Sequence, residues 1–167
     1  ADQIGMLATV MNCIYVSEIF RYVGMKTKIF TPFVLGAMTE LFSKEAAQES
    51  LSNGAVIFLA GGTGHPYFST DTATALRAIE LECDMIMMAR AVDGVYDSDP
   101  KLNPAAKKYD TVSYQELLDK KLAILDLTAT VMCMENKIPL LVFSLGEENG
   151  IVKNGNGTIT GTVVTVQ

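Results

Sequence analysis

Residues 61–72, GGTGHPYFSTDT, combine three glycines, four serine or threonine side chains and the only histidine of the chain, His65. Glycine lets the backbone approach a ligand closely, and hydroxyl groups donate hydrogen bonds to phosphate or ribose oxygens. The segment therefore indicates a phosphate- or nucleotide-binding loop, or else a glycine-rich turn before a helix that Thr70 or Asp71 caps. Both interpretations stay open, because the spacing matches neither GxxxxGKS/T nor GxGxxG.

A second candidate site is the loop 90–99, which lies within RAVDGVYDSDP and places Asp93, Asp97 and Asp99 around Tyr96. Tyr96 would pack on a planar ring, while a carboxylate would hold a ribose or an amino group. The loop lacks the D-x-D-x-D-G order and the terminal glutamate of a calcium loop, so a calcium site is disfavoured. Plain turn chemistry stays open as the alternative.

Apolar strands and helices alternate along the chain and must position both loops. A continuous apolar run such as 55–60 predicts a central parallel strand covered on both faces, and apolar spacing of three or four residues predicts a helix. This alternation is typical of an α/β fold with a mostly parallel sheet, in which ligands bind at the carboxyl ends of strands. The predicted strands are 26–31, 55–60, 83–89, 138–145 and 160–166, the predicted helices are 2–23, 34–53 with a break at Ser43, 71–82, 113–120 and 127–136, and segments 90–111 and KNGNG (153–157) are predicted loops.

The first predicted helix, 2–23, is apolar on two sides. The second of these sides runs through Leu7, Met11, Tyr15 and Ile19. A helix with this pattern is expected to be buried on more than one side.

The composition, 49% hydrophobic and 19% charged over 167 residues, is that of one globular domain with a core of its own. The net charge of −6 argues against a nucleic-acid partner, which usually meets a basic surface. We expect the longest apolar runs to be too short to cross a bilayer, so no membrane partner is predicted. Three widely spaced cysteines predict buried, reduced thiols in a cytoplasmic protein.

Three motifs follow one another along the chain: ADQIGMLATVMN, GGTGHPYFSTDTATALRAIEL and VDGVYDSDP. Together with LAILDLTATVMCMENKIPLLVF (122–143), they resemble the bacterial-type UMP kinases of the amino acid kinase family. The resemblance covers essentially the whole chain. It implies a three-layer α/β/α sandwich with a mostly parallel central sheet, and transfer of the γ-phosphate of ATP to UMP in pyrimidine nucleotide biosynthesis.

The resemblance also implies roles for individual residues. Asp2 matches the acidic residue that holds the UMP ribose, and Asp71 matches an aspartate that organises the phosphoryl-transfer site. Tyr96 and Asp99 match residues that contact the adenosine of ATP. The rest of the implied UMP site is the acceptor loop: Thr63, Gly64, His65, Pro66, Tyr67, Phe68, Ser69 and Thr70. Mg²⁺ is implied as the partner of ATP, held mainly by phosphate oxygens rather than by protein ligands.

Two residues depart from the family pattern. The family usually has asparagine at the position of His65, and an imidazole can still donate or accept a hydrogen bond. The family also carries a lysine-containing stretch before V-D-G, where this chain has Arg90. We expect Arg90 near the ATP phosphates or the adenine, although arginine and lysine are not interchangeable at such sites.

The K-x-S-G and G-G-G-N loops, with which family members grip the transferring phosphates, do not occur in this sequence. We therefore expect residues 1–167 to form a single partial domain, the C-terminal two-thirds of an amino acid kinase domain, which lacks its first strands and is inactive alone. The alternatives are a nucleotide-binding fragment, a non-catalytic structural relative of the same fold, and a kinase of this fold that acts on a carboxylate or carbamate. The acceptor loop disfavours the last alternative.

The resemblance further implies how the protein assembles and is regulated. Family members are cytoplasmic homohexamers built from dimers, and the helix at 2–23 lies in the region that they use for assembly. GTP and UTP are the implied effectors.

Overall fold

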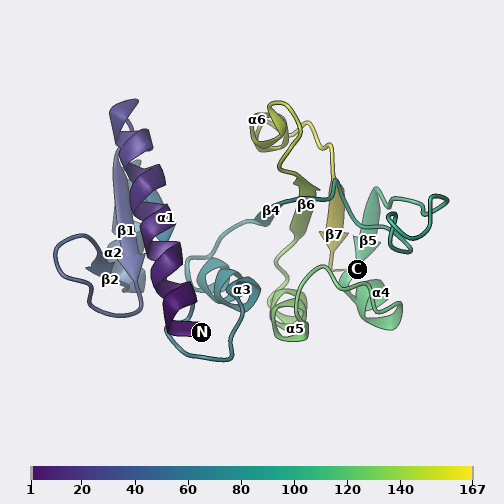
Figure 1. Ribbon diagram of the computed structural model, residues 1–167, viewed down its shortest axis with the longest axis horizontal. Coiled ribbons are helices and arrows are strands. Elements are labelled where there is room, and N and C mark those ends of the chain that lie inside the picture. The colour runs from purple at the N-terminus through teal and green to yellow at the C-terminus, as the bar shows by residue number, and fades with distance from the viewer. Residues whose placement is uncertain (1, 167) are drawn as a thin grey trace. The chain divides into compact units, whose positions relative to one another are not determined.

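The computed structural model of the chain describes residues 2–166 (Figure 1). These residues form two compact units, and the chain passes from the first unit to the second between Leu81 and Glu82. Each unit combines helices with a sheet of its own. Four of the five strand pairs are parallel and one, β6 with β7, is antiparallel, so the predicted α/β class with mostly parallel strands is confirmed.

The first unit begins with the long helix α1 and ends with the helix α3. Its elements are α1 (Asp2–Tyr22), β1 (Thr27–Thr31), β2 (Glu40–Leu41), α2 (Lys44–Ser52), β3 (Val56–Leu59) and α3 (Thr70–Glu80). The strand order is β2-β1-β3, and both pairs are parallel. Phe30 pairs with Leu59, so β1 and β3 end within one residue of each other. The loops after these two strands therefore leave the sheet at the same edge, where ligands bind in such folds.

One side of α1 packs against the sheet of its own unit (Figure 1). Val10 is buried together with Ile29 of β1 and Ala60, which follows β3. The hydroxyl groups of Ser17 and Thr27 form a hydrogen bond of 2.7 Å between the helix and β1. These contacts bring the N-terminal half of α1 next to the loop that follows β3.

The other apolar side of α1 is exposed, so the prediction of a helix buried on more than one side is wrong. Met11 is 70% exposed and Tyr15 is 69% exposed, and Leu7 and Ile19 on the same side are exposed as well. The physical reason is that the sheet of the first unit offers α1 one face. The side of the helix that points away from this sheet stays in solvent.

The helix α1 also corrects the expectation about membranes. By length and composition alone, its 21 residues are long and apolar enough to cross a bilayer, so the expectation that every apolar run is too short is wrong for α1. One such helix carries little weight, because a signal sequence or a core helix passes the same test. The bond between Ser17 and Thr27 and the packing of Val10 place α1 in the fold of the first unit.

Two other predictions in the first unit need correction. The helix predicted over 34–53 is shorter, because Gly36 has a positive φ of 60° and the chain turns before β2. Only α2 is helical, and the Ser43 hydroxyl caps it by accepting a hydrogen bond from the Ala46 N–H at 3.1 Å. The strand β3 is half-buried instead of covered on both faces, because it is an outer strand with one neighbour, β1.

The second unit contains a four-stranded sheet with the order β4-β6-β7-β5. Its elements are β4 (Ile86–Arg90), β5 (Thr111–Ser113), α4 (Tyr114–Asp119), α5 (Leu127–Glu135), β6 (Leu140–Ser144), α6 (Gly150–Gly155) and β7 (Thr162–Thr165). The pairs β4–β6 and β5–β7 are parallel, whereas β6 and β7 are antiparallel. The residues 140–143 of β6 are almost completely buried and form the centre of this unit.

The three cysteines form no disulfide. Cys133 is buried and Cys13 is half-buried, but Cys83 is exposed, so the prediction of buried thiols is wrong for Cys83. Desolvation raises the pKa of all three thiols above its usual value, and the charge of Asp84 adds to the rise at Cys83. Raised pKa values leave little of the nucleophilic thiolate at neutral pH.

Candidate functional site

The loop between β3 and α3 depends on glycine. Gly61, Gly62 and Gly64 have φ values of +85°, +62° and +82°, a region that favours glycine over every other residue. A Cβ atom on Gly61 would lie 3.0 Å from the ring of Phe33, and one on Gly64 would lie 2.9 Å from the Cβ of Pro32. The glycines therefore let this backbone rest directly on the segment that follows β1.

A pocket of ≈ 230 Å³ lies between this loop and the N-terminal half of α1. Its lining combines residues from the two segments: Asp2, Gly5, Met6, Thr9, Gly62, Thr63, His65, Phe68 and Thr70. Five of the nine residues predicted to hold UMP are in this lining. None of the residues predicted to hold ATP is in it. The loop residues Gly64, Pro66, Tyr67 and Ser69, also predicted to hold UMP, do not line the pocket.

Sequence reasoning missed Gly5, Met6, Thr9 and Gly62 as pocket residues. The first three belong to the same side of α1 as Asp2, since residues three, four and seven positions apart share one face of a helix. This periodicity, counted from Asp2, was the signal in the sequence that could have found them.

Two hydrogen bonds tie α1 to the loop. The Asp2 carboxylate accepts a bond from the Tyr67 N–H at 3.1 Å, and the Thr9 hydroxyl accepts one from the Gly61 N–H at 2.8 Å. The Thr9 hydroxyl in turn donates to the Met6 carbonyl at 2.7 Å. The helix therefore holds the loop at both ends of the pocket wall, while Asp2 lines the pocket.

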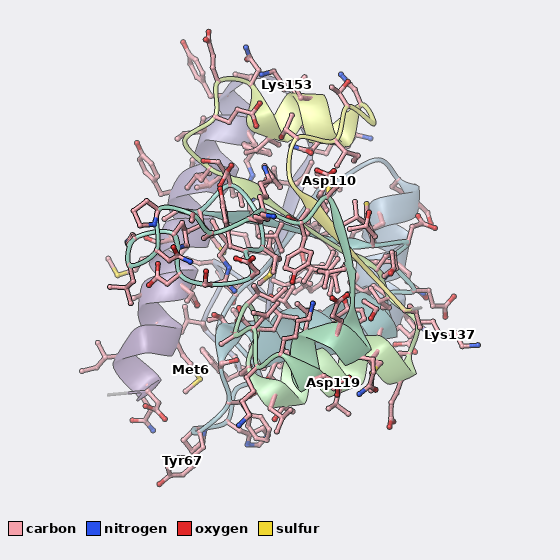
Figure 2. All side chains as sticks on the ribbon, turned by 90° about the vertical axis from the view of Figure 1, so that its right-hand side faces the viewer. Met6, Tyr67, Asp110, Asp119, Lys137 and Lys153 are labelled. Atoms are coloured by element: carbon pink, nitrogen blue, oxygen red, sulfur yellow. The ribbon has the colours of Figure 1, made fainter. Side chains whose placement is uncertain are left out.

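The loop presents its side chains in two ways. The Thr63 side chain turns back onto the loop, because its hydroxyl accepts a hydrogen bond from the backbone N–H of His65 at 3.2 Å. Tyr67, at a positive φ of 70°, extends away from the protein and is 97% exposed (Figure 2). Phe68 is 55% exposed even though it lines the pocket. The loop thus leaves two aromatic rings in solvent beside the pocket.

The helix α3 starts at the end of this loop, and Ser69 caps it. The Ser69 hydroxyl accepts a hydrogen bond from the Thr72 N–H at 3.0 Å, so the predicted cap at Thr70 or Asp71 is wrong by one or two positions. Asp71 lies in the first turn of α3 and is half-buried, but it does not line the pocket. No lysine or arginine of the described residues lines the pocket either. The positive end of the α3 dipole lies at Thr70, which belongs to the lining.

A second pocket, of ≈ 620 Å³, lies in the second unit. Its walls are residues 92 and 94–101 from the predicted loop, and residues 120–124 after α4. Tyr96 and Asp99 line it, as the ATP prediction requires, and Lys101, Lys120 and Lys121 line it too. Sequence reasoning missed these three lysines, because nothing in their spacing distinguishes them from solvated surface charges.

Arg90 does not line this pocket. It ends β4, and its guanidinium donates a hydrogen bond to the carbonyl of Ile124 at 3.2 Å. Ile124 belongs to the pocket wall. The structure thus places Arg90 behind the wall, where it holds residues 120–124 against β4.

The carboxylates of the predicted loop fold the loop back on itself. Asp99 accepts a hydrogen bond from the Lys101 N–H at 2.9 Å, and Asp97 accepts one from the Lys107 N–H at the same distance. The bond from Lys107 holds the pKa of Asp97 below its usual value. Asp97 and Asp99 therefore stabilise turns, as the alternative interpretation of this loop predicts. The same loop also lines a pocket.

Lys120, which lines the second pocket, is protonated at neutral pH. Its ammonium group donates to the Glu116 carboxylate and to the Tyr109 hydroxyl. These two bonds raise the pKa of Lys120 above its usual value. Within residues 2–166, no group of three or more His, Cys, Asp or Glu side chains is arranged to hold a metal ion.

Comparison with known proteins gives a consistent result. The model of the amino acid kinase family matches residues 1–144. Uridylate kinase PUMPKIN, a chloroplastic protein of Arabidopsis thaliana, is 43% identical over 164 residues, which are 98% of this chain and 48% of that protein. This chain therefore spans about half the length of the curated relative that it matches.

Solved structures agree in fold. The crystal structure of UMP kinase from Ureaplasma parvum matches with a TM-score of 0.95 and 34% identity, over 99% of this chain and 71% of that one. UMP kinase from Bacillus anthracis matches with a TM-score of 0.96 and 28% identity, over 99% and 69% of the two chains. The predicted amino acid kinase-like fold and the resemblance to UMP kinases are confirmed.

Proposed function

This chain belongs to the amino acid kinase family, and we propose that it is part of a UMP kinase, which transfers the γ-phosphate of ATP to UMP and releases UDP and ADP. The observation that carries the proposal is the pair of pockets at the two predicted loops, one beside α1 and one beside residues 120–124. The similarity to two bacterial UMP kinases and a plant uridylate kinase supports the same activity.

The first pocket is proposed to hold UMP. The N-terminus of α3, which begins at Thr70 in the pocket lining, suits the phosphate. The hydroxyls of Thr63 and Thr70 suit ribose or phosphate oxygens. Asp2 is proposed to accept from the ribose hydroxyls, for which it would give up or share its bond to the Tyr67 N–H. The loop would then close on the nucleotide with the rings of Tyr67 and Phe68.

The second pocket is proposed to hold ATP, with Tyr96 and Asp99 against the adenosine. Lys101 and Lys121 supply positive charge for a triphosphate, and Lys120 lies beside them, paired with Glu116. Arg90 is proposed to act indirectly, because its guanidinium supports the Ile124 carbonyl of the pocket wall. This replaces the expectation of a direct contact between Arg90 and the nucleotide.

In the proposed reaction a phosphate oxygen of UMP forms a bond to the γ-phosphorus of ATP, and the bond from that phosphorus to the β,γ-bridging oxygen breaks. Phosphoryl transfer of this kind needs positioning and charge neutralisation more than covalent catalysis. Asp71, in the first turn of α3, is the residue proposed to organise the transfer.

Mg²⁺ is proposed to bind together with ATP. The described residues offer no cluster of three metal ligands, which fits an ion whose ligands are mainly phosphate oxygens and water. When bound, Mg²⁺ would neutralise charge on the phosphates. The residues of this chain would act on the nucleotide around it, with the three lysines of the second pocket beside the phosphates.

Both units are proposed to belong to one amino acid kinase domain, which the match of the family model across the boundary at Leu81 supports. The exposed apolar side of α1 supports the proposed homohexamer, since a large apolar patch on a surface marks a site of protein association. GTP or UTP as effectors and a location in the cytoplasm stay predictions, and the plant relative is named as a chloroplastic protein.

A nucleotide-binding fragment without catalysis is the second candidate. The observation that favours it is the absence of lysine and arginine from the described lining of the first pocket, since phosphoryl transfer requires charge neutralisation at the reacting phosphates.

UDP formation from UMP, ATP and Mg²⁺ separates the two candidates. It is measured for this chain and for a version extended at the N-terminus to the length of its relatives. UDP formation by the extended protein supports the UMP kinase, and binding of both nucleotides without UDP formation by either protein supports the binding fragment. A preference for an amino acid carboxylate as the phosphate acceptor contradicts both.

A further inference from the structure

We propose that Asp93 and Lys108 are positioning residues that hold the Tyr96 side chain in place at the pocket of the second unit. The inference deepens the proposed function and rests on it, because Tyr96 is the residue proposed to contact the adenosine of ATP. Tyr96 lines the pocket, whereas Asp93 and Lys108 do not. The two charged residues therefore act on the ligand through the tyrosine.

The Asp93 carboxylate connects the other two side chains. The Tyr96 hydroxyl donates a hydrogen bond of 2.8 Å to Oδ1, and the Lys108 ammonium group donates one of 3.2 Å to Oδ2. Because each carboxylate oxygen has its own donor, the carboxylate cannot turn without losing a charge-assisted bond. The hydroxyl end of the Tyr96 ring is thereby fixed.

The backbone fixes the other end of the ring. Tyr96 and Lys108 face each other in an antiparallel bridge. The Tyr109 N–H donates to the Val95 carbonyl at 2.8 Å, and the Asp97 N–H donates to the Lys107 carbonyl at 3.0 Å. Residues on both sides of Tyr96 are therefore bonded to the segment that carries Lys108, and the ring is held from its Cα to its hydroxyl.

The path of the Lys108 side chain shows that its position is specific. A Cβ atom on Gly94 would lie 2.7 Å from Lys108 Cε and 2.5 Å from the Thr162 hydroxyl oxygen. The lysine therefore crosses directly over Gly94, where only glycine leaves room. Its ammonium group also donates to the Thr160 carbonyl at 3.0 Å, so it has partners on two segments of the unit. A solvated surface lysine has no such fixed path.

The charges in this group agree with its geometry. Desolvation pulls the pKa of Asp93 upward, but the bonds from Tyr96 and Lys108 outweigh it, and the pKa of Asp93 lies below its usual value. The bond to Asp93 raises the pKa of Tyr96 above its usual value. Tyr96 thus stays a neutral donor to a charged acceptor. A ring that is ordered before the ligand arrives reduces the entropy lost on binding.

Calorimetric titration of this chain with ATP and Mg²⁺, and separately with UMP, tests the inference. Tyr96→Phe, Asp93→Asn and Lys108→Met each remove one part of the group, and Lys108→Arg restores the charge. We expect the first three variants to bind ATP about three- to tenfold more weakly, with UMP affinity unchanged and Tm shifted by no more than about 2 °C. Lys108→Arg recovers part of the loss.

Lys153→Met is the matched control. Lys153 also belongs to the second unit, and its ammonium group pairs with the Glu147 carboxylate at 2.9 Å. Lys153 does not line the pocket. Unchanged ATP affinity in Tyr96→Phe and Asp93→Asn overturns the inference and leaves the proposed function standing. Equal losses of ATP and UMP affinity with a lower Tm also overturn it, since they show a merely structural role. If the unmodified chain binds no ATP, the proposed function fails and the positioning role fails with it.

Discussion

The two candidate loops differ in what forms their pockets: backbone in the first loop and charged side chains in the second. Loop 61–70 uses backbone: three glycines at positive φ, backbone N–H groups of Gly61 and Tyr67 that bond to side chains of α1, and no lysine or arginine in the described pocket lining. The second loop uses side chains: Asp93, Tyr96 and Lys108 bond to one another, and three lysines line the pocket. The first pocket should therefore respond to changes of shape, and the second to changes of charge.

The largest effect on the first pocket is expected from a side chain at Gly64. Its φ of +82° disfavours any Cβ, and the Cβ would lie 2.9 Å from Pro32. We expect Gly64→Ala to destabilise the first unit by about 2–3 kcal/mol and to weaken UMP binding at least about tenfold. Gly54→Ala is the control, because Gly54 of the same unit has a φ of +72° but no atom within 4 Å of its Cβ position, and it does not line the pocket. It should cost about 1 kcal/mol. Equal effects of both, measured by urea unfolding and UMP titration, would contradict the role of the contact with Pro32.

The next largest effect tests how α1 holds the glycine loop. Thr9→Val removes the hydroxyl that accepts the hydrogen bond from the Gly61 N–H. Gly61 is buried, so its N–H would be left without a partner. A donor left without a partner costs about 1–3 kcal/mol, and UMP affinity should fall with it. Thr74→Val is matched to it, since the Thr74 hydroxyl bonds only to the nearby Thr70 carbonyl on an exposed part of α3. Unfolding free energies that are the same for the two variants would show that the link between α1 and the loop contributes nothing.

Charge in the second pocket is tested by Lys121→Met. Lys121 lines the pocket, and its ammonium group would attract a triphosphate. We expect ATP affinity to fall about threefold at low salt, and the difference to shrink at 0.5 M salt because ions screen exposed charges. Lys137→Met, at an exposed residue of the same unit outside the pocket (Figure 2), should change nothing. A loss that persists at high salt would indicate that Lys121 acts by shape and not by charge.

The smallest expected effect is on acid stability. In the folded protein the bonds from Tyr96 and Lys108 hold the pKa of Asp93 below its usual value, so folding is favoured by deprotonated Asp93. This contribution is fully present above the unfolded pKa and is lost as the pH falls through the folded pKa. Because Asp93 is exposed, we expect it to be no more than about 0.5 kcal/mol. Unfolding at pH 3 and pH 6 should show a smaller difference in Asp93→Asn than in the unmodified chain, and a larger difference would contradict the sign.

The sequence was a good guide to what local residues decide. The glycines in 61–64 predicted backbone that can approach a ligand closely. The structure places all three at positive φ, and the approach to a ligand stays a prediction. The alternation of apolar runs predicted α1, α3, α4, α5 and most of the strands within a few residues, whereas the helix predicted over 34–53 is helical only in α2. The alternation did not predict α6, because the composition of KNGNG favours a loop. That helix depends on the buried Asn154 side chain, which bonds to the Gly150 carbonyl and to Thr160.

Contacts between distant segments could not be predicted in this way. Thr9 meets Gly61 across 52 residues, and nothing in the pattern of either segment indicates the pairing. Lys108 reaches Asp93 only because a bridge aligns Tyr96 with Lys108. The exposed side of α1 was predicted to be buried, because periodicity shows which side chains are apolar and not which layers are present to cover them.

Mapping of each nucleotide by backbone amide NMR shifts tests the central claim most directly. UMP and ATP with Mg²⁺ are titrated separately into the labelled chain. The account predicts that UMP shifts the amides of residues 61–71 and the first turns of α1, and that ATP shifts those of residues 92–101 and 120–124. UMP shifts confined to the second unit, or ATP shifts confined to the first, would contradict the assignment of one nucleotide to each pocket.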